Sequence, residues 1–529
     1  MADPGSGPAA RTVREVTFEL LRSLGMTTIF GNPGSTELPM FRAMPDDFRY
    51  VLGLQESVAL GMADGYAQAT HRAALVNLHS AVGVGNAMGS IFTAYRNRTP
   101  LVVTSGQQAR ELLSGEPYLY SEDAVALPRP YVKWSREPAR AQDVPAAIAR
   151  AYHVAMSPPR GPTLVSIPAD DWDRPAEPVP PHRVSHAVEA DAADLAELGA
   201  ALAAAARPTF VVGAAVDQEL AFAATVELAQ AHQARVWAAP MSSRCSFPES
   251  HPLFAGFLPP TRAGVRDCLE GSDLVLVLGA PVFTYRLTTP GPDVPPGARL
   301  YQLTDDPQQA AWTPQGTSIV TSIRPAVETL LAYGPTVPRP TPPLRPSPAP
   351  VATTDTITVE GLIQTLARVR PPDSVIVEEA PSTRPVMCEY LPNDEPESFY
   401  TCASGGLGLG LPSAVGMVLA RPDRRVITIV GDGSTMYSPQ ALWTAAQLGA
   451  APLTVLVVNN GGYATVHHFA RLLDIGKPVG ADLPGLDFVA LARAHGCQAA
   501  RVRRRAELEP ALVEALSSDV PFLLDVIVS

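Results

Sequence analysis

The sequence predicts an α/β protein with three doubly wound domains, each built on a parallel sheet. Two observations indicate this fold class. Short apolar runs rich in β-branched residues alternate with helical segments along almost the whole chain, and this alternation is typical of parallel sheets covered on both faces. In addition, two proline-rich segments divide the 529 residues into three blocks of comparable size, and a chain of this length is expected to form several domains.

The domain limits follow from the proline-rich segments. Residues 334–350 contain eight prolines and predict a semi-rigid, extended linker. A second break covers residues 172–181, after the strand-like run 163–167. We therefore predict domains at residues 1–180, 181–340 and 350–529.

Each block contributes its own strands and helices. In the first block, a helix is expected at 57–69, and in the second an alanine-rich helix at 192–206. The predicted strands share short apolar runs and lie at residues 28–30, 74–78, 101–104, 163–167, 209–212, 235–238, 274–278, 375–377, 426–430, 453–458 and 522–526. In the middle block, Gly213 and Gly279 end strands, but neither continues as Gly-x-Gly-x-x-Gly, so a dinucleotide site is disfavoured there.

The composition restricts the class of partner. Forty basic and 52 acidic side chains give a net charge of −12, which argues against a nucleic-acid-binding surface. The five cysteines are scattered without metal-ligand spacing and fit reduced thiols. Residues 1–11 do not resemble a secretory signal, and no apolar run is long enough to cross a bilayer. A cytoplasmic protein without a membrane partner is expected.

The third block carries the most informative motif, Gly431-Asp432-Gly433 followed after a 25-residue spacer (434–458) by Asn459-Asn460. Each half follows a predicted buried strand, so both halves are expected at the carboxyl edge of one sheet. The carboxylate of Asp432, the amide oxygen of Asn460 and the carbonyl of Gly462 form an oxygen set that suits Mg²⁺ bound to diphosphate.

The spacer between the two halves predicts a helix. Ser438 is expected as its N-cap and Pro439 as its first residue, with the helical run at 441–448. Gly449 is expected to end this helix. The motif therefore spans a complete strand-helix-strand unit.

Three residues of the first block are candidates for chemistry. Ser35 lies in the turn after strand 28–30, Glu56 lies just before helix 57–69, and His79 follows strand 74–78. Each also has an ordinary structural explanation. Ser35 could cap a helix, Glu56 could be a cap or a surface charge, and His79 could be a core histidine.

The combination of these residues with the third-block motif resembles the thiamine-diphosphate (ThDP) dependent enzymes, and among them the benzoylformate decarboxylase family. The resemblance rests on Phe-Gly-Asn-Pro-Gly-Ser-Thr-Glu-Leu-Pro at 30–39, Leu-Gln-Glu at 54–56, Asn-Leu-His-Ser at 77–80 and Ala-Ser-Gly-Gly-Leu-Gly at 403–408, together with the Gly-Asp-Gly and Asn-Asn motif. It spans nearly the whole chain.

The resemblance implies a pyrimidine domain, a central domain and a diphosphate domain. It implies ThDP and Mg²⁺ as cofactors, with Ca²⁺ as an alternative metal. It also implies a cofactor held between the first domain of one subunit and the third domain of its partner. A homodimer is then the minimum active unit, and a homotetramer is the usual assembly of the family. The implied reaction is the non-oxidative decarboxylation of an aromatic 2-keto acid, benzoylformate to benzaldehyde and CO₂, with carboligation as a side activity.

The same resemblance implies roles for individual residues. Glu56 would hold the aminopyrimidine, Ser35 would bind the substrate carboxylate, and His79 would transfer protons. Leu407 would support the bent cofactor. Further cofactor contacts are implied for Asn32, Pro33, Gly34, Ser382, Gly405, Asp432, Gly433, Ser434, Asn460 and Tyr463. The substrate pocket is expected to include Thr465, Val466 and Phe469 beside Ser35 and His79.

One position departs from the family pattern. A second active-site histidine would fall at about residue 286, and this chain has Arg286. An arginine stays charged and cannot relay protons at neutral pH, although it can pair with a carboxylate. Two alternatives therefore stay open: a carboligase related to acetolactate synthase, in which Arg286 binds a second carboxylate, and a ThDP-binding protein with impaired catalysis. His467 and His468 could compensate, but surface histidines are the simpler interpretation.

Overall fold

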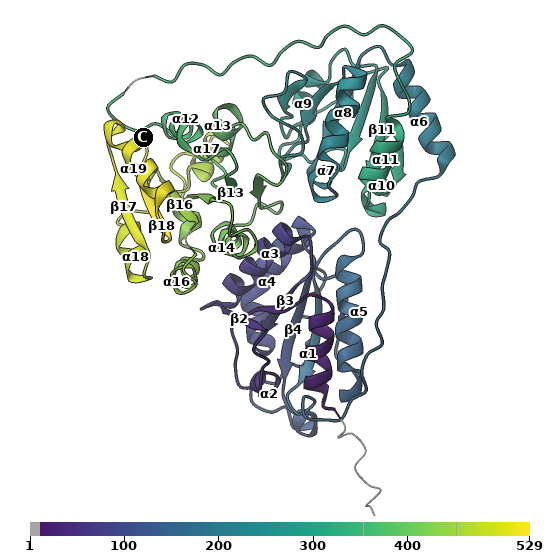
Figure 1. Cartoon of the computed structure of the whole chain (residues 1–529). Coiled ribbons are helices and arrows are strands. Elements are labelled where there is room, and N and C mark those ends of the chain that lie inside the picture. The colour runs from purple at the N-terminus through teal and green to yellow at the C-terminus, as the bar shows by residue number, and fades with distance from the viewer. Residues whose placement is uncertain (1–10, 353, 451) are drawn as a thin grey trace, which may run out of the picture.

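The computed structural model describes residues 11–352, 354–450 and 452–529, and it contains three six-stranded sheets with helices on both faces (Figure 1). The strand pairs within these sheets are parallel, which confirms the predicted fold class. The ten N-terminal residues, which include most of the segment tested for a secretory signal, lie outside the described part of the chain. Within the described part, no helix is long and apolar enough to span a bilayer.

The first sheet has the strand order β2-β1-β3-β4-β6-β5. Its strands are β1 (Thr28–Gly31), β2 (Arg49–Leu52), β3 (Ala74–Leu78), β4 (Leu101–Gln107), β5 (Ser135–Arg136) and β6 (Thr163–Pro168). Its helices are α1 (Val13–Ser23), α2 (Leu38–Phe41), α3 (Glu56–Thr70), α4 (Ser80–Asn97) and α5 (Val144–Met156). Because β1 and β3 are neighbours, the loops that follow them leave the same edge side by side.

The central sheet has the order β12-β11-β10-β7-β8-β9. Its strands are β7 (Pro208–Val212), β8 (Arg235–Ala238), β9 (Phe254–Phe257), β10 (Leu274–Leu278), β11 (Arg299–Thr304) and β12 (Thr317–Val320). Its helices are α6 (Ala192–Ala204), α7 (Ala214–Gln218), α8 (Phe222–His232), α9 (Arg262–Cys268), α10 (Pro307–Trp312) and α11 (Ile323–Leu330).

The third sheet has the order β14-β13-β15-β16-β18-β17. Its strands are β13 (Val375–Glu379), β14 (Phe399–Thr401), β15 (Val426–Gly431), β16 (Leu453–Asn459), β17 (Gln498–Val502) and β18 (Phe522–Ile527). Its helices are α12 (Val359–Val369), α13 (Arg384–Tyr390), α14 (Gly410–Ala420), α15 (Asp432–Thr435), α16 (Ala441–Gln447), α17 (Ala464–Leu472), α18 (Phe488–Ala494) and α19 (Arg505–Ser517). Neighbouring strands β13, β15 and β16 bring three loops to one carboxyl edge.

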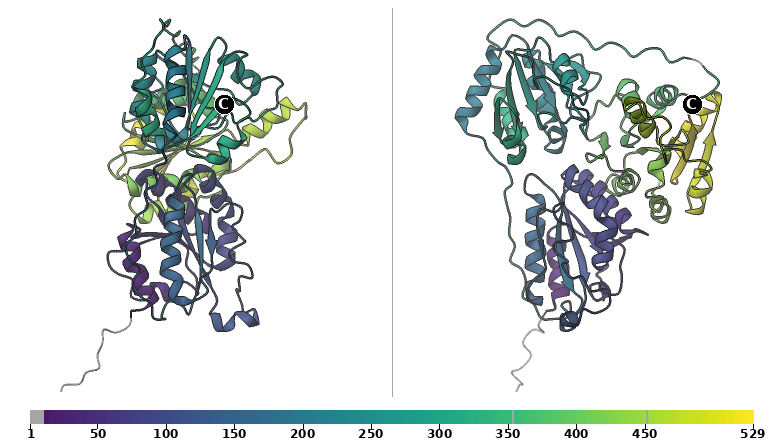
Figure 2. Two further views of the ribbon diagram at one scale, coloured as in Figure 1. Left: turned by 90° about the vertical axis from the view of Figure 1, so that its right-hand side faces the viewer. Right: turned by 180° about the vertical axis from the view of Figure 1, so that it is seen from behind.

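The first domain lies below the other two in both views of Figure 2 and packs against the third domain through α3 and α14. Glycines allow the two helices to approach closely. A Cβ atom at Gly65 would lie 2.0 Å from the carbonyl oxygen of Ser413, and one at Gly416 would lie 1.9 Å from that of Met62. Larger residues at these positions would force the two domains apart.

The proline-rich linker crosses the top of the view in Figure 1 as a long extended segment. It is anchored at both ends. Arg339 donates to the carbonyl oxygen of His232 at 2.7 Å, and Arg345 donates to that of Cys388 at 2.7 Å. The domain limits 1–180, 181–340 and 350–529 stay predictions.

The sequence-based N-cap and first residue of this third-domain helix were each wrong by two residues. Helix α16 begins at Ala441 with Gln440 as its N-cap, and Ser438 does not cap it. Backbone N–H groups of Ala441 and Leu442 instead donate to the carbonyls of Ser438 and Pro439, which forms a tight turn before the helix. Gly449, with φ of +57°, follows the helix as expected.

Candidate active site

The loop after β1 carries Ser35 at the carboxyl edge of the first sheet. Ser35 is exposed in a turn, and the N-cap position of α2 belongs to Glu37. The explanation of Ser35 as a helix cap is therefore excluded. The amide of Asn32 donates to the carbonyl of Gly53 at 2.8 Å and fixes the start of this loop. Pro33 follows it and is exposed.

His79 follows β3 and contacts the Ser35 loop through Glu37. Nδ1 of His79 lies 2.8 Å from Oε2 of Glu37, whose side chain is almost fully buried. The hydroxyl of Thr36 donates to the other carboxylate oxygen at 2.7 Å, and the backbone N–H of Gly34 donates to Oε2 at 2.8 Å. A carboxylate only accepts hydrogen bonds, so it holds the proton on Nδ1 of His79 and leaves Nε2 as the atom that can exchange a proton.

Gly34 is required sterically beside this pair. A Cβ atom at Gly34 would lie 2.2 Å from Nδ1 of His79. No side chain larger than hydrogen fits between the loop and the imidazole without moving one of them. The loop and His79 therefore form one packed unit.

Glu56 is the first residue of α3 and is neither a cap nor a surface charge. The cap is Gln55, whose side-chain oxygen accepts from the backbone N–H of Ser57 at 2.7 Å. Glu56 is 9% exposed, and its carboxylate accepts from the amide of Asn86 on α4 at 3.0 Å. A buried carboxylate with one side-chain donor retains acceptor capacity for a ligand.

In the third domain, Asp432 and Asn460 converge on the backbone N–H of Gly462. That N–H donates to Oδ2 of Asp432 at 3.0 Å and to Oδ1 of Asn460 at 3.2 Å. Asp432 is buried, and burial raises the pKa of its carboxyl group against the lowering effect of backbone N–H groups from Gly433 and Gly462. Asn459 serves another purpose, because its amide donates to Asp525 at 2.9 Å.

This arrangement fits a diphosphate held by a divalent cation. The three predicted metal ligands lie at adjacent strand ends and offer carboxylate, amide and carbonyl oxygens. Within residues 11–352, 354–450 and 452–529, no group of three His, Cys, Asp or Glu side chains is placed to hold a metal ion. A cation at Asp432 would therefore take the rest of its oxygen ligands from neutral groups and from the diphosphate.

Two serines are the predicted contacts for phosphate oxygens beside Asp432. Ser434 is buried next to it, and Ser382 is exposed just after β13. The ring of Tyr463 packs on Gly433, where a Cβ atom would lie 2.2 Å from a ring carbon. The short distance shows why glycine is needed at this turn.

The loop that carries Leu407 is held by Glu379, the last residue of β13. Its carboxylate accepts from three consecutive backbone N–H groups, those of Gly408 at 2.6 Å, Leu409 at 2.8 Å and Gly410 at 2.5 Å. Burial raises the pKa of Glu379 to about 7 in spite of these donors. Gly405, with φ of +71° and open space around its Cα, allows the loop to turn before Leu407.

Arg286 lies against the third domain, at Phe469 of α17. The carbon of its guanidinium is 4.4 Å from the centroid of the Phe469 ring, a cation–π distance. Thr465 and Val466 occupy the preceding turn of the same helix, and Val466 is 42% exposed. The predicted pocket residues of α17 and Arg286 are therefore close together.

The two histidines of α17 do not join this group. His467 lies 3.2 Å from Asp482, which also binds Lys477 at 3.1 Å, and His468 is exposed. His467 is thus engaged with the 477–482 segment. The interpretation as surface histidines fits this geometry better than compensation for Arg286.

The predicted residues form separate groups in one chain. Ser35, Glu56 and His79 lie on the first domain, whereas the Asp432 group, Leu407 and Phe469 lie on the third. Among the described residues, no hydrogen bond or ion pair joins Ser35, Glu56 or His79 to the third-domain group.

Sequence reasoning missed Glu37 and Glu379. Each is a buried carboxylate that accepts backbone N–H groups at the carboxyl edge of a sheet. A signal existed for Glu379, because Glu378-Glu379 ends an apolar strand where charge is unusual. Glu37 lay inside the quoted motif at 30–39, but nothing in the sequence connected it with His79.

Comparisons with known proteins agree with this architecture. Family models described as the N-terminal, central and C-terminal domains of thiamine pyrophosphate enzymes match residues 11–126, 195–330 and 382–526. The chain is 44% identical to benzoylformate decarboxylase of Pseudomonas aeruginosa, with 98% of each chain covered. It superimposes with a TM-score of 0.94 on a 4-hydroxybenzoylformate decarboxylase of Rhodococcus jostii RHA1, at 43% identity, covering 98% of this chain and 99% of that one. The acetolactate synthase large subunit of Haemophilus influenzae is 26% identical over 95% of this chain and 92% of its own length.

Proposed function

The chain belongs to the thiamine-diphosphate-dependent benzoylformate decarboxylase family, and we propose on that basis that it releases CO₂ from an aromatic 2-keto acid such as benzoylformate and yields the aldehyde. The family binds ThDP through its first and third domains, and this fits the two clusters at the carboxyl edges of the first and third sheets. The cofactor, when bound, accepts the electron pair of the breaking carbon–carbon bond.

The observation that carries the proposal is the hydrogen-bonded group formed by Glu37 and His79 beside Ser35. The carboxylate fixes the tautomer of His79, and the exposed hydroxyl of Ser35 follows Gly34 on the same loop. A serine hydroxyl can donate to a substrate carboxylate, and Nε2 of His79 can deliver a proton. A decarboxylase needs both functions at one place.

The chain's own residues divide the remaining tasks. We assign the binding of the cofactor's aminopyrimidine to Glu56. Its buried carboxylate accepts from Asn86 and can accept further hydrogen bonds. We assign the diphosphate, through Mg²⁺, to Asp432, Asn460 and the carbonyl of Gly462. We assign support of the bent cofactor to Leu407.

The proton balance of the reaction gives His79 its role. Loss of CO₂ breaks one carbon–carbon bond, and the aldehyde carries a hydrogen where the carboxylate was attached. That hydrogen must arrive as a proton. We propose that Nε2 of His79 donates it, with Nδ1 held on Glu37, and that Phe469 packs against the aryl group of the substrate.

A panel of keto acids tests the function. Purified protein with ThDP and Mg²⁺ would be given benzoylformate, 4-hydroxybenzoylformate, pyruvate and a branched 2-keto acid, and the products identified by chromatography. We expect CO₂ and free aldehyde from the aryl substrates at higher kcat/KM than from pyruvate. Absence of CO₂ release from every aryl substrate would refute the proposal.

A carboligase is the second candidate, and Arg286 is the observation that favours it. Its guanidinium stacks on Phe469 and is exposed, so its N–H groups can bind a second carboxylate. If a condensed 2-hydroxy ketone is the main product with pyruvate, this candidate replaces the first. A protein that retains ThDP but converts no keto acid would instead be a non-catalytic binding protein.

We also propose that two chains build each complete site. The first-domain and third-domain groups of one chain have no direct hydrogen bond to each other in the described residues, which fits a cofactor shared across a subunit boundary. A homodimer is then the minimum active unit, and a homotetramer is our expectation. Light scattering after size exclusion tests this, and an active monomer would contradict it.

A further inference from the structure

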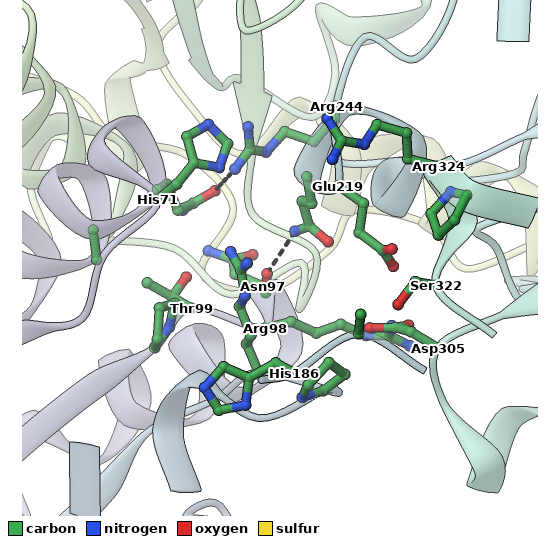
Figure 3. A pocket seen from close by; sticks show the side chains of 18 residues that line it. His71, Asn97, Arg98, Thr99, His186, Glu219, Arg244, Asp305, Ser322 and Arg324 are labelled. Carbon is green, nitrogen blue, oxygen red and sulfur yellow. Dashed lines mark hydrogen bonds and ion pairs between the residues drawn. The ribbon is translucent and has the colours of Figure 1, made fainter. Parts of the chain in front are cut away.

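A cavity of about 250 Å³ lies where the first and central domains meet (Figure 3). This volume is large enough for a small molecule. In Figure 3, His71 and Asn97 of the first domain face Glu219, Ser322 and Arg324 of the central domain across the cavity. Both walls are polar.

The cavity is far from Glu56 and His79, two first-domain residues of the candidate active site. Helix α3 begins at Glu56 and helix α4 follows His79, whereas the cavity lies at the opposite ends of these helices, at His71 and Asn97. Helices of 15 and 18 residues are ~22 and ~27 Å long. A ligand in the cavity therefore cannot touch Glu56 or His79.

The cavity contains an arginine without a partner. No hydrogen bond or ion pair reaches the guanidinium of Arg160 from any described residue, although its neighbours in the lining, Arg98 and Arg244, are paired with Asp305 and Asp217 at 2.6 and 2.9 Å. Burial lowers the pKa of Arg160, against the raising effect of Glu219 and Asp305. Arg160 is partly buried, and an anion that pairs with its guanidinium forms charge-assisted hydrogen bonds.

The cavity also contains a carboxylate oxygen without a donor. Oε2 of Glu219 accepts from the backbone N–H of Ile323 at 2.7 Å, whereas Oε1 is buried and has no hydrogen-bond partner among the residues that the structure describes. Burial, and then the charge of Asp305, raise the pKa of Glu219 to about 7. Glu219 and Arg160 influence each other's pKa, yet they form no direct ion pair. The two groups flank a space that a bridging molecule could fill.

We propose that this cavity is a binding site for a small oxyanion that carries a hydroxyl donor, either a 2-hydroxycarboxylate or a hydrogen phosphate. The oxyanion pairs with Arg160, with Arg324 on the adjacent wall, and the hydroxyl group donates to Oε1 of Glu219. Arginine is suited to this because its fork of donors matches carboxylate and phosphate oxygens. The proposal does not depend on which keto acid the enzyme decarboxylates.

Matched pairs of anions test the ligand chemistry. Isothermal titration of the ThDP-loaded holoenzyme at pH 8, where Glu219 is mostly ionised, would use L-malate against succinate and phosphate against sulfate. The members of each pair differ in the hydroxyl donor. We expect malate, phosphate or both to bind with saturation, and succinate and sulfate to bind at least roughly tenfold more weakly, the effect of one lost hydrogen bond to a charged group.

Variants connect the binding to the cavity. Arg160→Leu and Glu219→Gln should each raise the Kd of the anion by roughly tenfold or more. Arg160→Lys keeps the charge but loses the forked donor geometry, so it should raise the Kd less than Arg160→Leu does. Arg503→Leu, at an exposed arginine of the third domain, is the matched control and should bind as wild type does. Circular dichroism and ThDP content show that each variant is folded, and if Arg160→Leu is not folded, Glu219→Gln decides.

Three results would overturn the proposal. One is that none of the four anions binds at millimolar concentration. Another is that malate and succinate, and likewise phosphate and sulfate, bind equally. The third is that the folded Arg160→Leu and Glu219→Gln proteins bind as tightly as wild type. If only malate binds to the wild type and binds more weakly to these variants, the ligand class is a 2-hydroxycarboxylate. If only phosphate does so, the ligand class is a hydrogen phosphate.

Discussion

Nδ1 of His79 lies 2.8 Å from Oε2 of Glu37, and these two residues connect neighbouring loops at the carboxyl edge of the first sheet. Glu37 also accepts from Thr36 and from the backbone of Gly34. The carboxylate therefore fixes both the loop that carries Ser35 and the orientation of the imidazole. This relationship makes Glu37 a positioning residue for the proposed proton transfer.

Glu37→Gln tests that role. The amide oxygen can still accept from Nδ1–H, but the uncharged amide stabilises the protonated imidazole less than the carboxylate does. We therefore expect kcat to fall on the order of 100-fold or more, with a smaller change in KM. Initial rates with benzoylformate measure both constants. Glu328→Gln, at a half-exposed side chain of the central domain, is the matched control. Unchanged kcat in folded Glu37→Gln protein would exclude the positioning role.

Glu56→Gln separates cofactor activation from cofactor binding. The amide fills the same space but cannot share a proton with the cofactor base, so most turnover should be lost, roughly 100-fold or more. The diphosphate group at Asp432 is untouched, so the ThDP content of the purified protein should stay near that of wild type. Near-normal turnover would show that Glu56 has no catalytic part.

Asp432→Ala should abolish retention of the cofactor. The substitution removes the one carboxylate among the proposed metal ligands, so the Kd for Mg²⁺ should rise by roughly 100-fold or more. ThDP remaining after dialysis, measured by fluorescence of its oxidised form, gives the result. Asp267→Ala, at an exposed side chain, is the control. Full ThDP retention in Asp432→Ala would contradict the metal assignment.

Arg286→His tests the departure from the family pattern. If the position lacks a proton relay, the imidazole should raise kcat with benzoylformate, because histidine exchanges protons near neutral pH and arginine does not. If Arg286 binds a second carboxylate, the substitution should instead lower the yield of condensed product from pyruvate. Arg286→Leu separates the loss of charge from the gain of imidazole. No rise with benzoylformate would mean that position 286 is not a missing relay.

Glu379 predicts a pH-dependent component of stability. Its pKa is raised from 4.5 to about 7 by burial, so between these values the unfolded chain releases a proton that the folded chain keeps. Stability from this group therefore falls as pH rises from 4.5 to 7, by up to about 3 kcal/mol, and is constant above that range. The unfolding free energies of wild type and Glu379→Gln would be measured by urea titration at pH 5 and pH 8. We expect the wild-type value minus the Glu379→Gln value to be smaller at pH 8 than at pH 5. A difference independent of pH would contradict the raised pKa.

Much of the fold followed from local sequence patterns. The predicted strands at 74–78, 235–238 and 274–278 have the same first and last residues in the structure. A buried parallel strand appears in the sequence as a continuous apolar run bounded by turns, so its limits are easy to locate. The short edge strands β5 and β14 were not predicted, because two or three residues give too little pattern. Helix α16 began later than Ser438 because the preceding residues form a tight turn instead.

The candidate site was predictable only in part. Asp432, Asn460 and Gly462 could be proposed together because a strand-helix-strand unit brings consecutive strand ends to one edge. The contact of Arg286 with Phe469 could not be foreseen, since it joins the central and third domains. Nor could the unpaired guanidinium of Arg160, because its lack of partners depends on every surrounding element.

The sequence by itself determined the three sheets, the motifs at their edges and the family, because these depend on hydrophobic periodicity and on residues close together in the chain. Tertiary structure alone decided which nitrogen of His79 is held by Glu37, how Glu379 fixes the Leu407 loop, and where Arg286 lies. The physical reason is that hydrogen bonding and burial act between atoms in space. Groups from separate strands and domains meet only after the chain has packed, and the pattern along the sequence does not contain those distances.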